Sequence, residues 1–382
     1  MKRLFDTVDS LYESYIKIWE DICNIESPTS YKEGVDAVGK YCADFAEAHG
    51  WKVEYCRQPV SGDVVCITMN PNAKGQTISL SGHMDTVHPL GSFGSPAVHI
   101  EGEKIYGPGV CDCKGGIVVA LLAMDALDKC GYCDRPIQLL LQSDEEGGSR
   151  GSNKETIKYM CEKAKDSVAF INLENYVPGK AVLIRKGIIT FNFKITGKEA
   201  HSSKCATSGA NAIAEAAHKI IELEKIKDEK GLTCNCGVIS GGTVPNTVPG
   251  YCEFKANVRF ANSEQLEWIK EHVKKVADNV YVEGCSCEVE QYGFRVAMEY
   301  SQKNVELFEK INIIFEKNGL SRLEQTSGHG GSDAADVTVF GIPCIDDLGA
   351  KGGLIHNTGE YAYLDTLHDT PKRLAAIICD LK

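Results

Sequence analysis

The chain has 382 residues, of which 43% are hydrophobic and 25% are charged, so it is long enough to bury the cores of two domains. Its formal net charge is -12, and no cluster of Lys and Arg offsets it, which argues against nucleic acid as a partner. The longest apolar stretch, residues 115–124, is about half as long as a membrane span, which argues against a membrane partner.

The N-terminal residues and the cysteines favour a cytoplasmic protein. Residues 1–23 place apolar side chains at helical spacing among charged ones, unlike the continuous apolar block of a signal peptide. The 17 cysteines are scattered through a large chain, so we expect most of them to be buried free thiols. The three C-x-C pairs, which begin at Cys111, Cys234 and Cys285, lack the two-residue gap of zinc knuckles, so structural zinc is not expected there.

Up to residue 180, helical and strand-like patterns alternate, which is typical of an α/β domain. The run 137–142 is apolar almost throughout, as in a strand of a parallel sheet that helices cover on both faces. The patterns predict helices over residues 33–49, 115–129 and 153–164, and strands over residues 52–56, 64–69, 77–81, 137–142 and 167–173.

The pattern changes after residue 180. Residues 187–196 alternate between apolar and polar side chains, as in a half-exposed antiparallel strand. Strands over 187–196, 234–240, 251–260 and 286–292, with helices over 211–226 and 263–279, give the order βαββαβ. This order predicts a ferredoxin-like sandwich of four antiparallel strands with two helices on one face.

The α/β pattern returns after residue 294. It predicts a helix over 304–318, a glycine-rich turn over 327–332, a helix over 333–340 and a strand over 343–348. We therefore expect a discontinuous α/β domain formed by residues 1–180 and 294–382. An α+β domain of residues 181–293 would interrupt it, at a usual domain size.

Three short segments combine acidic side chains with histidine or glycine: residues 82–85, 110–116 and 143–148. The first and third leave the predicted strands 77–81 and 137–142. Loops that leave the ends of parallel strands collect ligands at one edge of the sheet, so we expect these segments to meet there.

Side chains in these segments, together with Glu174 and His356 further along the chain, suit two metal ions. A catalytic zinc site uses histidine nitrogens and carboxylate oxygens and leaves a position for water, and two metals need a bridging carboxylate. The candidate ligands are His83, Asp112, Glu146, Glu174 and His356. Such ligands suit zinc, cobalt and manganese alike.

Two further acids have candidate roles beside the metals. Asp85, two residues after His83, can turn back to the second nitrogen of that imidazole. Glu145 and Glu146 are adjacent, so they cannot easily bind one metal in the same way. One of them can bind metal while the other serves as a general base for a metal-activated water.

These motifs closely resemble those of metallopeptidase family 20, the zinc-dependent amidohydrolases that include glutamate carboxypeptidase, acetylornithine deacetylase, succinyl-diaminopimelate desuccinylase, aminoacylase and peptidase T. The resemblance spans nearly the whole chain and rests on the H-x-D of residues 83–85, the G-x-x-D-x-K-G-G of 109–116, the D-E-E-G of 144–147, the inserted sandwich and the histidine at 356 near the end of the sequence. It implies a zinc-exopeptidase-like domain with a central mixed sheet, interrupted by a dimerisation and lid domain.

The resemblance also implies the roles of the site residues. His83 and Glu174 would hold one metal ion, Glu146 and His356 the other, Asp112 would bridge them and Glu145 would be the base. In the inserted domain, the segment 197–203 resembles one whose histidine, here His201, stabilises the oxyanion in the active site of a partner subunit. Asn246 and Arg259 resemble groups that hold the carboxylate of the substrate, and Arg suits this role because it binds carboxylate with two hydrogen bonds.

The sequence departs from the family pattern at two positions. Cys113 stands where many relatives have methionine, and Asn175 stands where proline commonly follows the glutamate. Cys111 and Cys113 flank the expected bridge, and we expect core thiols there in preference to metal ligands. In relatives the peptide bond after the bridging aspartate is cis, so a cis Asp112–Cys113 bond is expected.

His88, His99 and His329 match no motif and receive no role.

The expected function is therefore metal-dependent hydrolysis of an amide or peptide bond next to a free carboxylate. Carboxypeptidase or N-acyl-amino-acid deacylase activity on small substrates is favoured, with two divalent ions, most simply zinc, and a homodimer. Tripeptide or dipeptide aminopeptidase action is an alternative, as is a noncatalytic metal-binding scaffold. Each candidate residue also has a structural reading, such as a core histidine, a helix cap or a turn.

Overall fold

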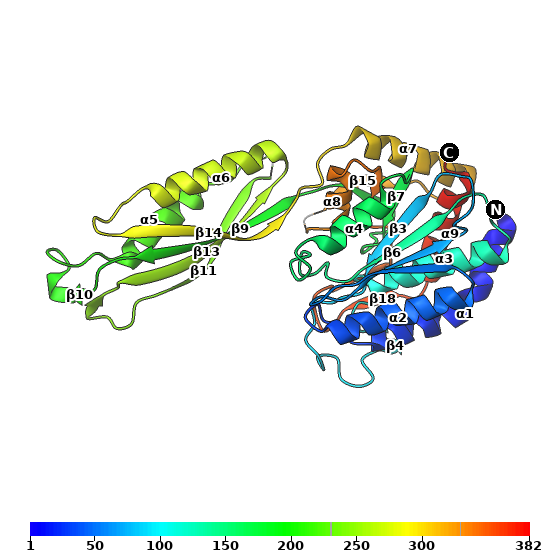
Figure 1. Cartoon of the computed structure of the whole chain (residues 1–382), viewed down its shortest axis with the longest axis horizontal. Coiled ribbons are helices and arrows are strands. Elements are labelled where there is room, and N and C mark those ends of the chain that lie inside the picture. The colour runs from blue at the N-terminus through cyan, green and yellow to red at the C-terminus, as the bar shows by residue number, and fades with distance from the viewer. Residues whose placement is uncertain (230, 329) are drawn as a thin grey trace. The chain divides into compact units, whose positions relative to one another are not determined.

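The computed structural model describes residues 1–229, 231–328 and 330–382, and these form two compact units (Figure 1). The first unit comprises Met1–Ile184, Tyr300–Ser327 and Ser332–Lys382. The second comprises Arg185–Glu299 and Gly328–Gly331. An α/β unit is thus interrupted by an α+β unit, and the expected fold class is confirmed at this level.

A six-stranded mixed sheet forms the centre of the first unit. Its order is β1-β2-β6-β3-β7-β16. The β2 strand is antiparallel to both β1 and β6, whereas β6, β3, β7 and β16 run parallel. The strands are β1 (Lys52–Cys56), β2 (Val64–Met69), β3 (Ile78–His83), β6 (Ile137–Gln142), β7 (Ala169–Asn172) and β16 (Cys344–Ile345). Strands β2, β3, β6 and β7 are buried along their whole length, which explains their continuous apolar character.

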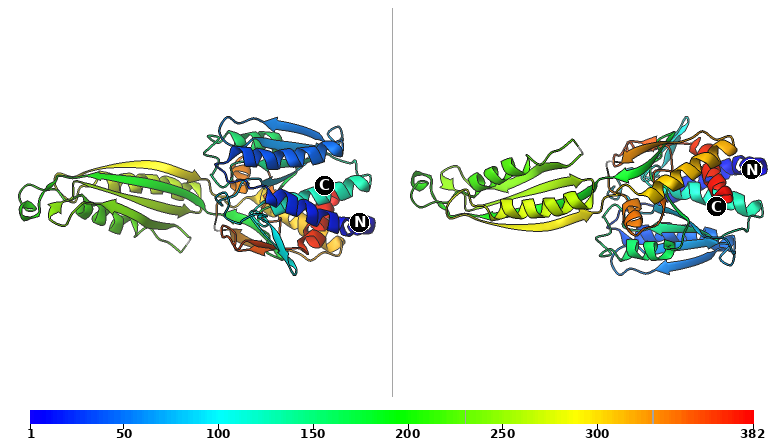
Figure 2. Two further views of the ribbon diagram at one scale, coloured as in Figure 1. Left: turned by 90° about the horizontal axis from the view of Figure 1, so that it is seen from below. Right: turned by 90° about the horizontal axis from the view of Figure 1, so that it is seen from above.

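Helices pack on this sheet and on one another. The main core joins the sheet to α1 (Lys2–Asn24), α2 (Lys32–Ala48), α3 (Lys114–Lys129), α7 (Gln302–Lys317) and α9 (Thr366–Asp380). Helices α1 and α9 pack together, so both chain ends lie on this unit (Figures 1 and 2). Two shorter helices, α4 (Glu155–Ala164) and α8 (Asp333–Val339), contact β6, β7 and β16. No helix in the described ranges is both long and apolar enough to cross a membrane.

A second, smaller sheet in the first unit is absent from the predicted elements. Its order is β17-β18-β5-β4, and it consists of β4 (His99–Glu101), β5 (Lys104–Tyr106), β17 (Gly352–Gly353) and β18 (Tyr361–Tyr363). The pairing of β18 with β5 joins segments that are more than 250 residues apart in the chain. It brings the loop after β5 next to the loop between β17 and β18.

The second unit has the predicted ferredoxin-like arrangement. Its sheet has the order β11-β13-β9-β14, and every neighbouring pair is antiparallel. The elements are β9 (Gly187–Thr196), α5 (Ala212–Leu223), β11 (Thr233–Gly241), β13 (Tyr251–Phe260), α6 (Ser263–Asp278) and β14 (Ser286–Arg295). Alternate residues of β9 and β13, such as Phe193 and Phe254, form its core with the two helices.

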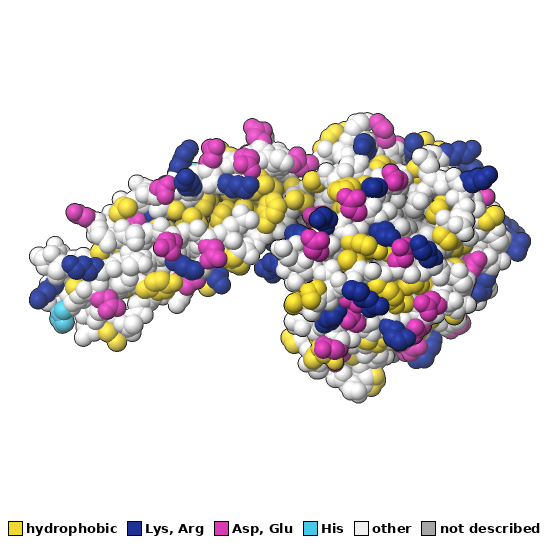
Figure 3. All heavy atoms as spheres, viewed as in Figure 1, with side chains coloured by type: hydrophobic (Ala, Val, Ile, Leu, Met, Phe, Trp, Pro, Cys, Tyr) yellow, Lys and Arg dark blue, Asp and Glu magenta, His cyan; other side chains and the backbone are white. Residues whose placement is uncertain are grey.

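Short elements complete the chain. In the second unit, β10 (Ala200–His201) pairs with β12 (Thr247–Val248), and Ser202–Lys204 form one 3-10 turn. The β8 strand (Lys180–Arg185) pairs with β15 (Glu324–Gly328), so a strand extends into the segment predicted as a glycine-rich turn. On the face shown in Figure 3, Lys and Arg lie among Asp and Glu, so a ligand would meet no field of a single sign there.

Candidate metal centre

Three strand ends position the first part of the site. His83 is the last residue of β3, Glu145 and Glu146 follow β6 after a two-residue turn, and Glu174 follows β7. Because β6, β3 and β7 are adjacent and parallel, their carboxyl ends meet at one edge of the sheet. The structure therefore confirms that the segments after β3 and β6 meet at one edge of the sheet.

The smaller sheet supplies the other two residues. Asp112 lies in the segment between β5 and α3, and His356 lies in the loop between β17 and β18. The backbone of His356 is left-handed, with φ 63°, a conformation that a non-glycine residue adopts rarely and often at functional positions. The Asp112–Cys113 peptide bond is cis, as the resemblance implied.

The five predicted ligands lie together around Asp112. Its Oδ1 is 3.0 Å from His83 Nε2, and its Oδ2 is 3.1 Å from His356 Nε2. Glu174 Oε2 lies 3.8 Å from the same nitrogen of His83, and Glu146 Oε2 lies 3.4 Å from the same nitrogen of His356. Each oxygen of Asp112 thus faces a different histidine–glutamate pair, which is the arrangement that a carboxylate bridging two metals requires.

The nitrogen and oxygen atoms of these five side chains are suitable ligands for divalent metal ions. Imidazole nitrogen and carboxylate oxygen suit zinc, cobalt and manganese. Among the described residues, His83, Asp112 and Glu146 form one group whose ligand atoms lie within 4.8 Å of one another, and His83, Cys113 and Glu174 form another. The two groups share His83, and Asp112 belongs to the first of them.

The pKa shifts reflect crowded negative charge. Burial raises the pKa of Glu174 well above its usual value, and burial also raises the pKa of Glu146 despite its contact with His356. Hydrogen bonds to Asp112 and Glu146 raise the pKa of His356 to about 10. Burial alone would raise the pKa of Asp112, but its hydrogen bonds to His356 and His83 outweigh burial and lower the pKa.

The orientation of the His83 ring leaves Nε2 facing the other ligands. Burial alone would lower the pKa of His83, but the surrounding Cys113, Glu174 and Asp112 outweigh it and raise the pKa well above its usual value. Nδ1 lies 2.9 Å from the backbone carbonyl of Asp85 and 3.4 Å from its carboxylate. A proton on Nδ1 therefore leaves the lone pair of Nε2 for a metal ion.

Asp85 also holds the two adjacent glutamates in place. Its Oδ1 accepts the backbone N–H of Glu145 and its Oδ2 accepts that of Glu146, both at 3.1 Å. Thr29 donates its hydroxyl to Oδ2 at 2.7 Å. Asp85 is fully buried, so it fixes both the His83 ring and the turn after β6.

The structure places Glu145 beside the ligand cluster and separately from it. Its side chain is buried, and its charge acts on both Glu146 and Glu174. Among the described residues, neither group of potential ligands includes Glu145. A carboxylate that lies next to metal ligands without belonging to them can accept a proton from water.

Glu360 is an unpredicted residue that holds the site together. It is 1% exposed, and its Oε1 accepts the backbone N–H groups of Cys111 at 2.9 Å and Asp112 at 3.0 Å. Its Oε2 accepts Gly109 N–H at 3.3 Å and lies 3.2 Å from His88 Nε2. Because Glu360 is the last residue of the β17–β18 loop, it ties the Asp112 segment to the loop that contains His356. A single acid four residues after His356 belongs to no motif, so sequence patterns do not reveal its role.

The three site residues predicted in the second unit fall into two groups. His201 and Asn246 are exposed and lie side by side, because Ser202 N–H donates to the Asn246 carbonyl and His201 pairs with Thr247. Arg259 is half-buried near the end of β13, eight residues beyond Tyr251, which corresponds to roughly 27 Å along a strand. Within a single chain, Arg259 and Asn246 therefore lie near opposite ends of β13.

The remaining histidines near motifs have other contacts. His88 faces Glu360, and His99 is exposed and stacks on Tyr106 with ring centroids 4.9 Å apart. His329 lies outside the described residues.

Comparisons with known proteins agree with this fold and site. Residues 183–285 match the model of a peptidase dimerisation domain, and residues 64–229 match that of peptidase family M28. The second match spans His83, Asp112, Glu146 and Glu174. The inserted position of the dimerisation domain confirms that part of the expected fold class.

Relatives resemble the chain over most of its length. It is 30% identical to carboxypeptidase G2 of Pseudomonas sp. (strain RS-16), over 99% of this chain and 92% of the relative. It is 25% identical to acetylornithine deacetylase of Myxococcus xanthus, over 89% of this chain and 90% of the relative. The crystal structure of aminopeptidase PepT from Bacillus cereus ATCC 10987 has a TM-score of 0.81 at 23% identity, covering 96% of this chain and 98% of that one, and so shares the fold.

Glu360→Gln tests whether this residue positions the metal ligands. A glutamine amide has nearly the same size, but its NH2 group cannot accept the N–H groups that the carboxylate holds. We expect metal affinity to fall about 10- to 100-fold, as when an outer partner of a ligand is lost. Competition with a chromogenic chelator measures it. Glu101→Gln, at an exposed position of the same sheet, is the control. Unchanged affinity in a folded Glu360→Gln protein would remove Glu360 from the site.

Proposed function

The chain belongs to the M20 family of metallopeptidases, and we propose that it is a dinuclear zinc hydrolase that releases an amino acid from a small peptide or an N-acyl amino acid. The observation that carries this proposal is the position of Asp112, whose two oxygens face two different histidines at 3.0 and 3.1 Å. The 30% sequence identity to a carboxypeptidase, which extends over 99% of this chain, supports hydrolysis of an amide or peptide bond as the reaction class.

We assign His83 and Glu174 to one metal ion, Glu146 and His356 to the other, and Asp112 to both. Two bound divalent ions would lower the pKa of a water molecule and polarise the carbonyl of the scissile amide. The strongly raised pKa of Glu174 is consistent with the assignment, because burial and neighbouring acids disfavour its charged form and a bound cation would offset both effects. Zinc is the proposed ion, with cobalt and manganese as alternatives.

Glu145 is the proposed general base and acid. Its carboxylate would take a proton from the attacking water and return it to the departing amine. Its burial beside the ligands supports this role, since proton transfer needs contact with the water and exclusion of bulk solvent. Asp85 would keep the His83 ring and the Glu145 backbone fixed through the reaction.

The second unit is the proposed dimerisation and lid domain, with domain limits at 181–293 inside a catalytic domain of 1–180 and 294–382. The match of residues 183–285 to a peptidase dimerisation domain supports a homodimer. His201 would stabilise the oxyanion and Asn246 and Arg259 would hold the substrate carboxylate. Arg259 and Asn246 lie near opposite ends of β13 in one chain. This separation supports an arrangement in which His201 and Asn246 of one protomer act at a site that contains Arg259 of its partner.

Two other functions remain as alternatives. The fold shared with PepT favours tripeptide or dipeptide aminopeptidase activity as the second candidate. A noncatalytic metal-binding scaffold is the third, and the presence of Glu145 beside the ligands argues against it, because metal binding alone needs no additional base.

A cytoplasmic location is also proposed. All 17 cysteines lie within the described residues and none of them forms a disulfide, which suits a reducing compartment.

Glu145→Gln separates catalysis from metal binding. The amide keeps the shape of the side chain but cannot accept a proton, so turnover should fall about 100- to 10,000-fold while two metal ions still bind. Steady-state kinetics and metal analysis on the same preparation measure both. Glu155→Gln changes an exposed glutamate at the start of α4 and should leave turnover unchanged. Full activity in Glu145→Gln would exclude Glu145 as the base.

A substrate panel distinguishes the proposed activities. The metal-loaded protein is assayed on free dipeptides, N-blocked dipeptides, N-acyl amino acids and tripeptides with a free amino end. We expect cleavage of the N-blocked compounds that carry a free carboxylate, loss of all activity with a chelator, and recovery with zinc. Cleavage only of substrates with a free amine would favour the aminopeptidase, and metal binding without any turnover would favour the scaffold.

Mixing two inactive variants tests whether His201 acts across a dimer. Glu145→Gln and His201→Ala homodimers should both be nearly inactive. If His201 serves the partner's site, each mixed dimer has one site with an intact Glu145 and an intact His201, so random mixing should restore about a quarter of wild-type activity. Size-exclusion chromatography checks the dimer. Restoration would be absent if His201 acted within its own subunit.

A further inference from the structure

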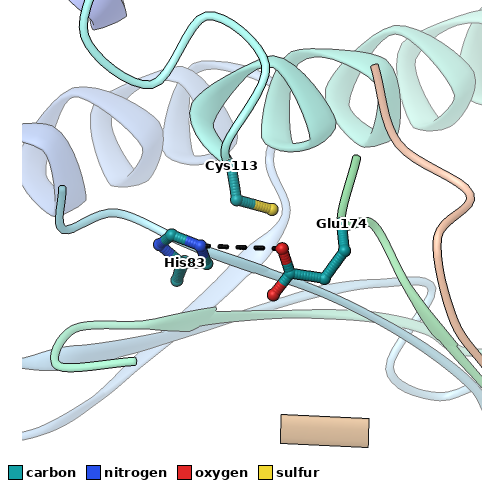
Figure 4. A group of neighbouring side chains, drawn as sticks. All are labelled: His83, Cys113 and Glu174. Carbon is teal, nitrogen blue, oxygen red and sulfur yellow. Dashed lines mark ion pairs between the residues drawn. The ribbon is translucent and has the colours of Figure 1, made fainter. Parts of the chain in front are cut away.

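Cys113 lies beside two of the proposed metal ligands. The ligand atoms of His83, Cys113 and Glu174 all lie within 4.8 Å of one another. Figure 4 shows the Cys113 side chain descending from the start of α3 so that its sulfur points toward the His83–Glu174 pair. The pair itself is 3.8 Å apart, with His83 Nε2 facing Glu174 Oε2. The sulfur is therefore on the side of His83 where a metal ion would sit.

The immediate surroundings hold the sulfur in this position. Cys113 is fully buried, and its Sγ donates to the carbonyl of Leu173 at 3.0 Å, next to Glu174 in the chain. Cys113 is also the N-cap residue of α3, so the start of that helix fixes its backbone.

Cys111 provides an internal comparison. It is equally buried and only two residues away, but its Sγ faces Asn175 Oδ1 at 3.0 Å and the Ala350 carbonyl at 3.6 Å. Among the described residues, no group of potential ligands includes Cys111. The two thiols of this C-x-C pair therefore have different neighbours, and only one of them shares space with His83 and Glu174.

We propose that the sulfur of Cys113 binds the same metal ion as His83 and Glu174. This inference rests on the metal centre proposed above and adds a thiolate to it. One half of the centre then has nitrogen, oxygen and sulfur ligands, and the other half, with Glu146 and His356, has nitrogen and oxygen only. When the metal binds, the S–H bond breaks, its proton leaves to solvent, and its electron pair forms the metal–sulfur bond.

The additional ligand makes the two metal positions chemically unequal. Thiolate is a soft ligand that favours zinc and cadmium, whereas carboxylate and water suit manganese and magnesium. The Cys113 position should therefore retain zinc or cadmium in competition with manganese, while the His356 position exchanges its metal more freely. The sequence analysis favoured a core thiol at Cys113. It used the alternation of side chains in an extended segment, and this alternation does not reveal which side chains next to Asp112 point toward the metal.

X-ray absorption on the zinc-loaded protein tests the proposal directly. At two zinc ions per chain, the zinc spectrum should contain a sulfur shell at about 2.3 Å, with one sulfur for every two zinc ions. Cys113→Ser should remove that shell and weaken zinc binding at one of the two positions by more than the 10- to 100-fold typical of losing an outer partner. Cys111→Ser is the matched control and should keep both the shell and the affinity.

Each outcome is decisive. Two bound zinc ions without a sulfur shell in the wild-type protein would overturn the role of Cys113 and leave the proposed metal centre intact. A shell that persists in Cys113→Ser would assign the sulfur to another residue. Failure of the wild-type protein to bind zinc, cobalt or manganese would overturn both proposals. If Cys113→Ser does not fold, Cys113→Ala replaces it, and the wild-type spectrum alone can still refute the inference.

Discussion

Most features of this protein depend on the concentration of negative charge around Asp112. Three carboxylates that lie mostly out of solvent, Asp112, Glu146 and Glu174, share a small space with two imidazoles, and a fourth, Glu145, lies beside them. Burial penalises the charged form of each carboxylate and the neighbouring like charges add to this cost, so the pKa values of Glu146 and Glu174 are raised. Protons can relieve it, and divalent cations can relieve it more completely while leaving the carboxylates charged. The fold keeps an arrangement that is unfavourable without cations, which is how functional sites commonly differ from the rest of a structure.

Two further buried acids hold this arrangement in place, and neither is needed as a ligand. Asp85 fixes the His83 ring and the backbone of Glu145 and Glu146 at the edge of the large sheet. Glu360 fixes the Asp112 segment to the loop that carries His356. Each accepts backbone N–H groups with both carboxylate oxygens. The site is thus built from two rigid supports, and Asp112 lies where they meet.

Sequence patterns predicted the parts of the structure that have long periodic elements. The runs before His83 and Glu145 are apolar and of strand length, so both the strands and the convergence of their ends followed from simple rules. The small sheet was not predicted because its strands have two or three residues and its two local strand pairs are joined only by the distant pairing of β18 with β5. Glu360 was missed for the same reason, since only that pairing brings it to Asp112. The separation of Arg259 from Asn246 also required the register of β13, which composition does not reveal.

The order of the ligands along the chain has a consequence for biosynthesis. Four of the proposed ligands precede the inserted unit, whereas His356 follows it. A ribosome must therefore translate the whole insertion before the last proposed ligand exists, and the hairpin that carries His356 can pair with β5 only after that. A nascent chain that has not yet reached this hairpin lacks part of the proposed centre, so it cannot use that centre to cleave the peptides around it.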